Sequence, residues 1–206
     1  KKHIRHILVA LMALSLIMLA GCGGGSSEES EAPESSQPET AEAAEPADPI
    51  GIHHAEITIK DYGTVSVELD GDTAPITVQN FMDLANDGFY DGLTFHRIID
   101  GFMIQGGDPS GNGSGGSGRT ITGEFKANGW DNSISHVTGT ISMARAKHPD
   151  SASSQFFIVH QDSTDLDGAY AVFGYVTEGM AAVLSGRVVE AAGGEELKGA
   201  QLTVTK

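Results

Sequence analysis

HAEITIKDYGTVSVELDGDTAPITVQNFMDLANDGF, residues 54–89, decides the fold because the spacing of its apolar residues changes partway along. Its first half holds two segments in which apolar and polar residues alternate, separated by Asp61, Tyr62 and Gly63. Alternation with a period of two is typical of strands that bury one face, and a short polar link between two such strands predicts a β-hairpin. We therefore expect the folded domain to begin with two antiparallel strands, from about residue 53.

The second half of the same stretch changes to helical spacing. Pro75 suits the first turn of a helix, where its missing N–H would have no partner in any case. Gly88 suits the position just after the last turn, where a left-handed backbone ends many helices. Four apolar residues fall on one face of the helix predicted between these two positions: Val78, Phe81, Met82 and Ala85.

Further short apolar runs predict more strands, and one later segment predicts a second helix at residues 179–189. Many strands, few helices and glycine-rich turns indicate a mainly β protein, an antiparallel β-barrel or sandwich with two helices packed against it. The runs that predict strands are residues 94–99, 102–105, 138–143, 155–160, 171–176 and 202–205.

Composition and charge exclude one large class of function. Of the 206 residues, 39% are hydrophobic, which is enough for one domain with its own core. The chain carries 12 Lys and Arg against 28 Asp and Glu, a formal net charge of −16. Nucleic-acid binding needs basic side chains that neutralise phosphates, so we expect no nucleic-acid partner. No segment has the pattern of a subunit interface, and we expect a monomer.

The first 21 residues resemble the signal peptide of a bacterial lipoprotein. A positively charged start precedes an apolar run at residues 7–20, shorter than the roughly 20 residues of a membrane span. The run ends in LAGC, residues 19–22, which resembles a lipobox, where the cysteine thiol receives a diacylglycerol. We expect lipidation of Cys22 and a location outside the cytoplasm, anchored to the outer face of the cytoplasmic membrane or to an outer membrane. The alternative is an inert thiol in a removed leader or a tail.

Residues 22–50 follow with a very different composition, mainly Gly, Ser, Glu, Ala and Pro. Such a segment cannot bury enough apolar area to offset the entropy lost on ordering. We therefore expect an acidic, disordered tether between the lipid anchor and a folded domain at residues 51–206. Cys22 is the only cysteine, so no disulfide can form within the chain.

Two motifs for other chemistries are weak. GNGSGG, residues 111–116, satisfies G-x-G-x-x-G, but that fingerprint must open a helix and the residues after it show no helical pattern. We interpret it as a flexible loop. The eight histidines show no spacing typical of metal ligands, and no G-x-S-x-G elbow is present, so we expect neither a metal site nor a serine nucleophile.

Several separate segments of the domain resemble the cyclophilins, a family of peptidyl-prolyl cis/trans isomerases. The segments are FHRIIDGFMIQGGD (95–108), SQFFI (154–158) and LDGAYAVFG (166–174), supported by APITVQNF (74–81) and GEF (123–125). They stand in collinear order within residues 53–206. The resemblance implies a closed eight-stranded antiparallel β-barrel capped by two α-helices, and an enzyme that needs no cofactor.

The resemblance also implies roles for individual residues. Arg97 corresponds to the catalytic arginine of the family, and Gln105 and His96 fall on neighbouring catalytic positions. Ala144 and Arg145 occupy the strand edge whose main chain pairs with the substrate backbone. The pocket that receives the substrate proline falls on Phe102, Met103, Phe157 and Leu166, and the remaining substrate-binding positions fall on Gln155 and Tyr170.

Three positions depart from the pattern of many eukaryotic members and agree with bacterial ones. Asp165 replaces a tryptophan whose indole the family uses on cyclosporin, which implies weak inhibition by that drug. Tyr170 replaces a histidine. Arg145 replaces an asparagine, and because main-chain atoms carry the substrate contact there, we expect little loss of activity.

We therefore expect an isomerase that acts on proline-containing, unfolded or extended polypeptides and assists the folding of secreted or cell-envelope proteins. One alternative is a non-catalytic chaperone or surface adhesion module that binds proline-containing segments, which an activity measurement would separate. Another is a nucleotide-dependent enzyme built on the glycine loop, which requires a helix after Gly116.

Overall fold

The computed structural model describes residues 51–184 and 202–205. It confirms the hairpin, because β1 (Ile52–Ile59) and β2 (Gly63–Asp70) pair antiparallel with Ile59 opposite Gly63. Asp61 turns the chain between them with a left-handed backbone, at a φ of 66°. Apolar residues on the inner face of both strands are buried while their neighbours are more exposed, so the alternation in the sequence sets which face joins the core.

The helix predicted after the hairpin is α1 (Pro75–Asn86), and all four residues of its predicted apolar face are buried. Gly88 follows its end with a φ of +69°, and its N–H donates to the Ala85 carbonyl at 3.1 Å. The start of α1 has no capping side chain of its own. Instead the buried carboxylate of Glu124 accepts hydrogen bonds from the N–H groups of Ile76 (2.9 Å) and Thr77 (2.7 Å).

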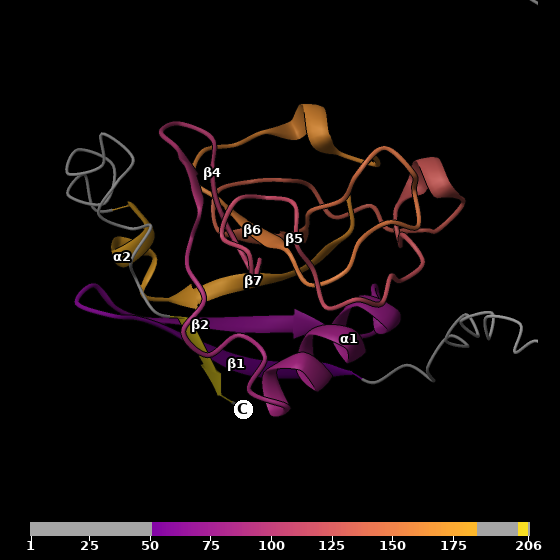
Figure 1. Cartoon of the computed structure of the whole chain (residues 1–206). Coiled ribbons are helices and arrows are strands. Elements are labelled where there is room, and N and C mark those ends of the chain that lie inside the picture. The colour runs from indigo at the N-terminus through magenta and orange to yellow at the C-terminus, as the bar shows by residue number, and fades with distance from the viewer. Residues whose placement is uncertain (1–50, 185–201, 206) are drawn as a thin grey trace, which may run out of the picture. The chain divides into compact units, whose positions relative to one another are not determined.

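The remaining strands appear where the apolar runs predict them, α2 lies within the second predicted helix, and two short 3₁₀ helices, η1 and η2, were not predicted. In chain order they are β3 (Arg97–Ile99), β4 (Met103–Gly106), η1 (Lys126–Asn128), β5 (Thr140–Met143), β6 (Phe156–Val159), η2 (Thr164–Leu166), β7 (Val172–Glu178), α2 (Met180–Leu184) and β8 (Leu202–Thr205). All strands join one antiparallel sheet in the order β3-β4-β6-β5-β7-β2-β1-β8. The helices α1 and α2 both pack against β2, and α1 also contacts β8 (Figure 1).

The expectation of a closed barrel is not met. Within the described residues the sheet ends at β3 on one side and at β8 on the other, and no pairing joins these two edges. Among the described strands, β3 pairs only with β4, and β8 pairs only with β1. A pattern of alternating residues predicts which segments are strands but not whether the first and last strands of a sheet meet.

The core divides into two clusters, and the smaller one positions the site. The larger lies between the sheet and α1, where the rings of Phe81, Tyr90, Phe156 and Phe173 pack at centroid distances of 5.2 to 5.7 Å. The smaller contains Met103, Phe157 and Val159, with partly buried side chains packed against it.

Several predictions from the sequence concern residues outside the described part of the chain. They are the signal segment at residues 1–21, Cys22 and the tether at residues 22–50, and the end of the second predicted helix at residues 185–189. No helix in residues 51–184 or 202–205 is long and apolar enough to cross a membrane.

Candidate active site

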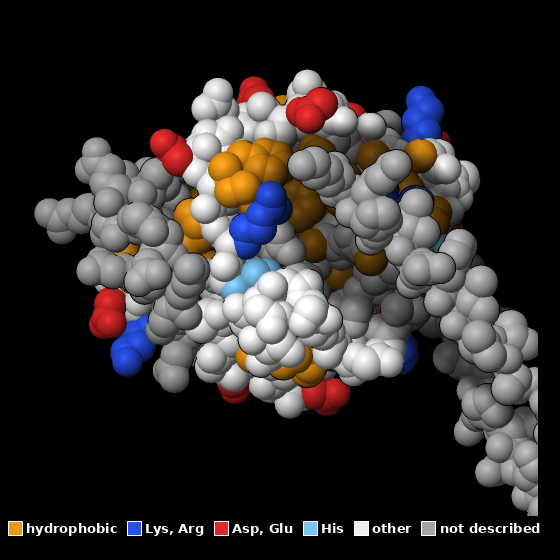
Figure 2. Space-filling view, turned by 45° about the horizontal axis from the view of Figure 1, so that its top comes forward, with side chains coloured by type: hydrophobic (Ala, Val, Ile, Leu, Met, Phe, Trp, Pro, Cys, Tyr) orange, Lys and Arg blue, Asp and Glu red, His pale blue; other side chains and the backbone are white. Residues whose placement is uncertain are grey.

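A pocket of about 490 Å³ opens beside β3, β4 and β6. Aliphatic and aromatic side chains line one part of it and cationic or amide side chains the other, and Figure 2 shows hydrophobic side chains gathered beside a basic side chain and a histidine. Such a mixture of an apolar wall and a few polar groups is typical of ligand sites. The lining residues are His96, Arg97, Phe102, Met103, Gln105, Asn112, Gly113, Ala144, Arg145, Phe157, Leu166 and Tyr170.

A row of hydrogen bonds holds the guanidinium of Arg97 at the pocket. Arg97 lies opposite Gln105 in the pairing of β3 with β4, and its Nη1 donates to Gln105 Oε1 at 3.3 Å. Gln105 Nε2 donates in turn to Gln155 Oε1 at 2.8 Å. Gln155 Nε2 completes the row by donating to the carbonyls of Gly113 and Gly115, at 3.1 and 2.7 Å. The orientation of Arg97 is therefore tied to three separate segments of the chain.

The smaller core cluster forms the apolar wall. Met103 and Phe157 are almost fully buried, while Phe102 and Leu166 pack against them and are partly exposed. Met103 comes from β4 and Phe157 from β6, so strand pairing fixes their positions. An apolar surface partly open to solvent and backed by a packed core can hold a small rigid ring in one place.

Arg145 holds the wall through its side chain. Its Nε and Nη2 donate to the Ala169 carbonyl at 3.0 and 2.8 Å, and its Nη1 donates to the Ala146 carbonyl at 3.0 Å. Its guanidinium carbon lies 4.7 Å from the ring centroid of Tyr170, a cation–π contact. The sequence pointed to the main chain of this residue, and the structure adds that the side chain fixes Tyr170.

The main chain at the end of β5 is partly used within the protein. The N–H of Ala144 donates to the Gln155 carbonyl at 2.9 Å, so this group is not free to pair with a bound peptide. Ala144 nevertheless lines the pocket and packs against the smaller core cluster.

His96 faces the pocket with both ring nitrogens buried, and neither has a hydrogen-bond partner among the described residues. Burial lowers the pKa of this imidazole, Asp108 opposes the effect, and the positive charge of Arg97 adds to it. His96 is therefore neutral at pH 7, and neither of its ring nitrogens is open to the pocket.

The glycine loop is organised around one buried carboxylate. Asp108 is 1% exposed and accepts hydrogen bonds from the N–H groups of Ser110 (2.8 Å), Asn112 (3.0 Å) and Gly113 (2.6 Å). Burial acts to raise its pKa, but these bonds outweigh burial and lower it. A side chain at Gly115 would collide with this carboxylate, since a Cβ there would lie 2.1 Å from Asp108 Oδ1.

The loop is thus tied down, whereas its glycine content predicts flexibility. Residues 117–125, all within the described part of the chain, form no helix, which removes the condition for a nucleotide-binding fingerprint. No group of three or more His, Cys, Asp or Glu among the described residues could hold a metal ion.

The structure brings together nearly all of the residues that the sequence selected. Ten of them line the pocket, and Gln155 lines an adjoining pocket of about 220 Å³ while bonding to Gln105. Cys22 lies outside the described residues. The sequence left open whether the glycine loop reaches the site; Asn112 and Gly113 do line the pocket. Asp108, a carboxylate just before a run of small residues, was the one sequence feature that could have indicated an ordered loop at this place.

Comparison with known proteins gives one consistent family. The family model described as cyclophilin type peptidyl-prolyl cis-trans isomerase/CLD matches residues 54–202. A peptidyl-prolyl cis-trans isomerase B of Bacillus subtilis is 49% identical over 122 residues, which are 59% of this chain and 82% of that relative. A peptidyl-prolyl cis-trans isomerase of Helicobacter pylori is 46% identical over 124 residues, 60% of this chain and 73% of that relative.

Solved structures agree. A crystal structure of a cyclophilin type peptidyl-prolyl cis-trans isomerase from Cryptosporidium parvum matches with a TM-score of 0.63 and 29% identity, over 75% of this chain and 96% of that chain. A second structure of the same protein was determined in the presence of the dipeptide Ala-Pro. It matches with a TM-score of 0.62 and 29% identity, over 74% of this chain and 98% of that chain.

Proposed function

Because this chain belongs to the cyclophilin-type peptidyl-prolyl cis-trans isomerases and shares their activity, we propose that it works through Arg97 and the apolar wall beside it. The observation that carries the proposal is the placement of a fixed guanidinium on one pocket with Phe102, Met103, Phe157 and Leu166. The substrate class is a polypeptide segment that contains proline.

The chemistry requires no bond to break. Rotation about an X-Pro peptide bond destroys amide resonance, and the barrier is about 18–20 kcal/mol, so spontaneous exchange takes tens to hundreds of seconds. A catalyst must only bind the twisted amide more tightly than the planar one. Neither a nucleophile nor a cofactor is needed for that difference.

Arg97 can supply this difference. When the amide twists, the lone pair returns to the prolyl nitrogen, which becomes a hydrogen-bond acceptor. A guanidinium that donates to this nitrogen therefore stabilises the transition state selectively. Arginine suits the task because it stays protonated and presents its donors in a rigid fork. The bond from Arg97 to Gln105 restricts that fork before the substrate arrives.

The apolar wall holds the proline ring still while the X-Pro bond rotates. We propose that the proline ring packs against Met103 and Phe157 while the preceding carbonyl turns toward the polar side of the pocket. The Gln105 amide lines the pocket and can exchange hydrogen bonds with the moving segment, whereas the ring nitrogens of the neighbouring His96 are buried. Support for the ligand class comes from the related Cryptosporidium parvum structure determined in the presence of Ala-Pro.

Replacement of Arg97 by alanine tests the proposal. We expect Arg97→Ala to lower kcat/KM on a proline tetrapeptide at least about 100-fold, the usual loss when one transition-state donor is removed. A protease-coupled isomerisation assay measures this loss. Arg119→Ala is the matched control, because Arg119 is exposed and does not line the pocket. Near-normal turnover by folded Arg97→Ala would exclude the proposed role.

We also propose that the enzyme acts outside the cytoplasm. The LAGC sequence at residues 19–22 supports a lipid anchor at Cys22, and the acidic segment that follows supports a tether to a domain at residues 51–206. At that place the substrates are secreted or cell-envelope proteins during folding, where slow X-Pro exchange can limit the rate.

A further inference from the structure

His136 lies directly behind the apolar wall. The residue is 0% exposed, and its ring is nearly parallel to that of Phe157, with an interplanar angle of 12° and a centroid distance of 6.0 Å. Tyr170 packs edge-on against the His136 ring, at a centroid distance of 6.4 Å. Two aromatic residues of the pocket, Phe157 and Tyr170, therefore share one buried imidazole as a neighbour. His136 itself does not line the pocket.

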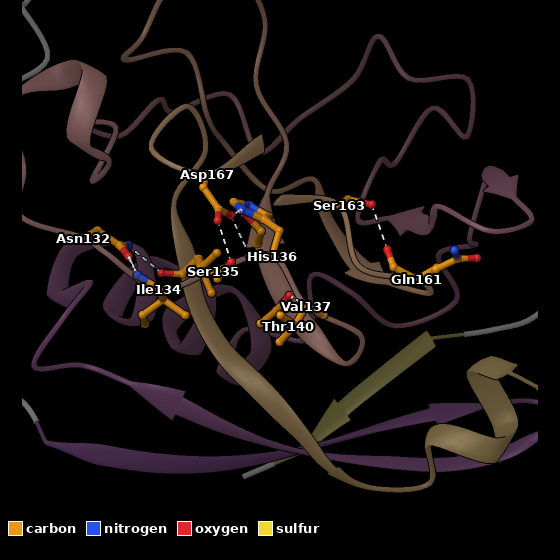
Figure 3. A network of polar contacts seen from close by, with 11 residues as sticks. Asn132, Ile134, Ser135, His136, Val137, Thr140, Gln161, Ser163 and Asp167 are labelled. Atoms are coloured by element: carbon orange, nitrogen blue, oxygen red, sulfur yellow. Dashed lines mark hydrogen bonds and ion pairs between the residues drawn. The ribbon is translucent and has the colours of Figure 1, made fainter. Parts of the chain in front are cut away.

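Asp167 joins His136 to the segment that carries Leu166 and Tyr170. The Asp167 carboxylate accepts hydrogen bonds from the hydroxyl of Ser135 at 2.5 Å, from the N–H of His136 at 2.7 Å and from His136 Nδ1 at 2.9 Å (Figure 3). Asp167 directly follows η2. One carboxylate thus ties the chain beside the pocket to the neighbouring segment at residues 135–136.

The ionisation states of His136 and Asp167 determine which atom donates in each of their hydrogen bonds. Burial lowers the pKa of His136, although Asp167 and Asp165 oppose it, so the ring is neutral at pH 7. Burial acts to raise the pKa of Asp167, but its hydrogen bonds outweigh burial and lower it, so the carboxylate is ionised. An ionised carboxylate only accepts, so Nδ1 of His136 carries the proton. Nε2 then accepts from the Ser142 hydroxyl at 3.1 Å.

We propose that His136 and Asp167 are positioning residues of the proline pocket, fixing the Phe157 ring from behind and holding Leu166 and Tyr170 at its edge. The inference rests on the proposed function, since it assigns a role within the same pocket. Neither residue lines the pocket, so both act through the side chains that do.

This arrangement predicts a specific division of kinetic effects. Arg97 is held by Gln105 and the glycine loop, none of which contacts the pair through a hydrogen bond that the structure describes. Loss of the pair should therefore loosen the wall that binds the proline ring and leave the donor in place. Binding should weaken while turnover of the bound peptide is largely kept.

The test compares Asp167→Asn with Asp162→Asn. Asp162 is a matched control because its carboxylate accepts two hydrogen bonds from Thr138, at 2.8 and 3.0 Å. Neither Asp162 nor Thr138 lines the pocket. We expect Asp167→Asn to raise the dissociation constant of a proline tetrapeptide about 3- to 10-fold, the range for one lost hydrogen bond, with kcat within about twofold. Asp162→Asn should match the wild type in both. Calorimetric or NMR titration gives the constant independently of catalysis.

A second variant guards against misfolding. Ser135→Ala removes one donor to Asp167 and leaves both partners of the pair, so we expect a folded protein with a smaller rise in the dissociation constant. Wild-type binding by both folded variants, or by Ser135→Ala if Asp167→Asn does not fold, would overturn the inference. A fall in kcat with unchanged binding would overturn it as well. An inactive wild type would instead contradict the proposed function, whatever the titrations show.

Discussion

Asp165 lies at the rim of the site but not inside it. It is exposed in η2, next to Leu166, and only Leu166 lines the pocket. Resemblance to the cyclophilins implies that many eukaryotic members carry at this position an indole that donates to cyclosporin, whereas this chain has a carboxylate. A carboxylate offers no N–H donor, so the wild-type protein should be inhibited weakly.

A substitution makes this expectation measurable. We expect Asp165→Trp to tighten inhibition by cyclosporin about tenfold, which is the effect of one added hydrogen bond with some apolar contact. Its kcat/KM on a tetrapeptide should stay close to that of the wild type, because position 165 does not line the pocket. Inhibition curves for the two proteins under the same assay provide the comparison. Nanomolar inhibition of the wild type would contradict the prediction.

At the residue scale, the sequence pointed to residues in continuous motifs that the structure places around one pocket. Arg97, Phe102 and Gln105 lie within one 14-residue motif and line the same pocket, and strand pairing sets Arg97 opposite Gln105. The contact behind the pocket could not be predicted in this way, although Asp167 itself lies in the LDGAYAVFG motif. His136 and Asp167 are 31 positions apart, and their contact depends on how two separate loops meet in the fold.

At the element scale, α1 depends on a carboxylate far along the chain. Glu124 accepts both of the hydrogen bonds at the start of α1, from a position 47 and 48 residues away from its partners. The residue before the helix is Ala74, which makes no side-chain cap of its own. Glu124 thus does the work of an N-cap and also faces the positive end of the helix dipole.

Glu124→Gln should therefore destabilise the domain. A glutamine side chain has one acceptor oxygen, so one N–H of α1 would meet an amide NH₂ group without a bond. We expect the free energy of unfolding to fall by about 1–3 kcal/mol, with a fall in Tm of about 2–8 °C. Thermal unfolding followed by circular dichroism measures the change. Glu56→Gln, on the exposed face of β1, is the control, and equal melting of both variants would contradict the role given to Glu124.

Sequence patterns predict the individual helices and strands but not how the edges of the sheet are arranged. Alternation and helical spacing predicted α1, the β1–β2 hairpin and the other strands to within a few residues, because each pattern reports local burial. The two edges of the sheet carry no such signal. Whether β3 and β8 meet depends on the twist and curvature summed over the whole sheet.

At the scale of the whole molecule, the site differs in charge from the chain around it. The formal net charge is −16, yet among the described residues the side chains that line the pocket include Arg97 and Arg145 and no carboxylate. A cationic pocket in an acidic protein favours the carbonyl oxygens and developing lone pair of a peptide without attracting polyanions in general.

The lipid anchor proposed at Cys22 would set where the whole molecule works. A diacylglycerol thioether would hold the chain at a membrane with two acyl chains, which is sufficient for stable anchoring. Behaving as a random coil, residues 23–49 would span about 30 Å on average, and repulsion between their carboxylates would extend them further. An active site on such a tether could reach substrates over a volume larger than the domain itself.

Metabolic labelling with a fatty acid tests this claim in the producing cells. We expect the wild-type protein to incorporate the label and to sediment with membranes, and Cys22→Ala to lose the label because no other cysteine is available. The purified domain at residues 51–206 should keep full kcat/KM, since the pocket residues all lie within it. Label retained by Cys22→Ala would show that the lipid is attached elsewhere. An unlabelled wild-type protein would mean that Cys22 belongs to a leader or tail without an anchor.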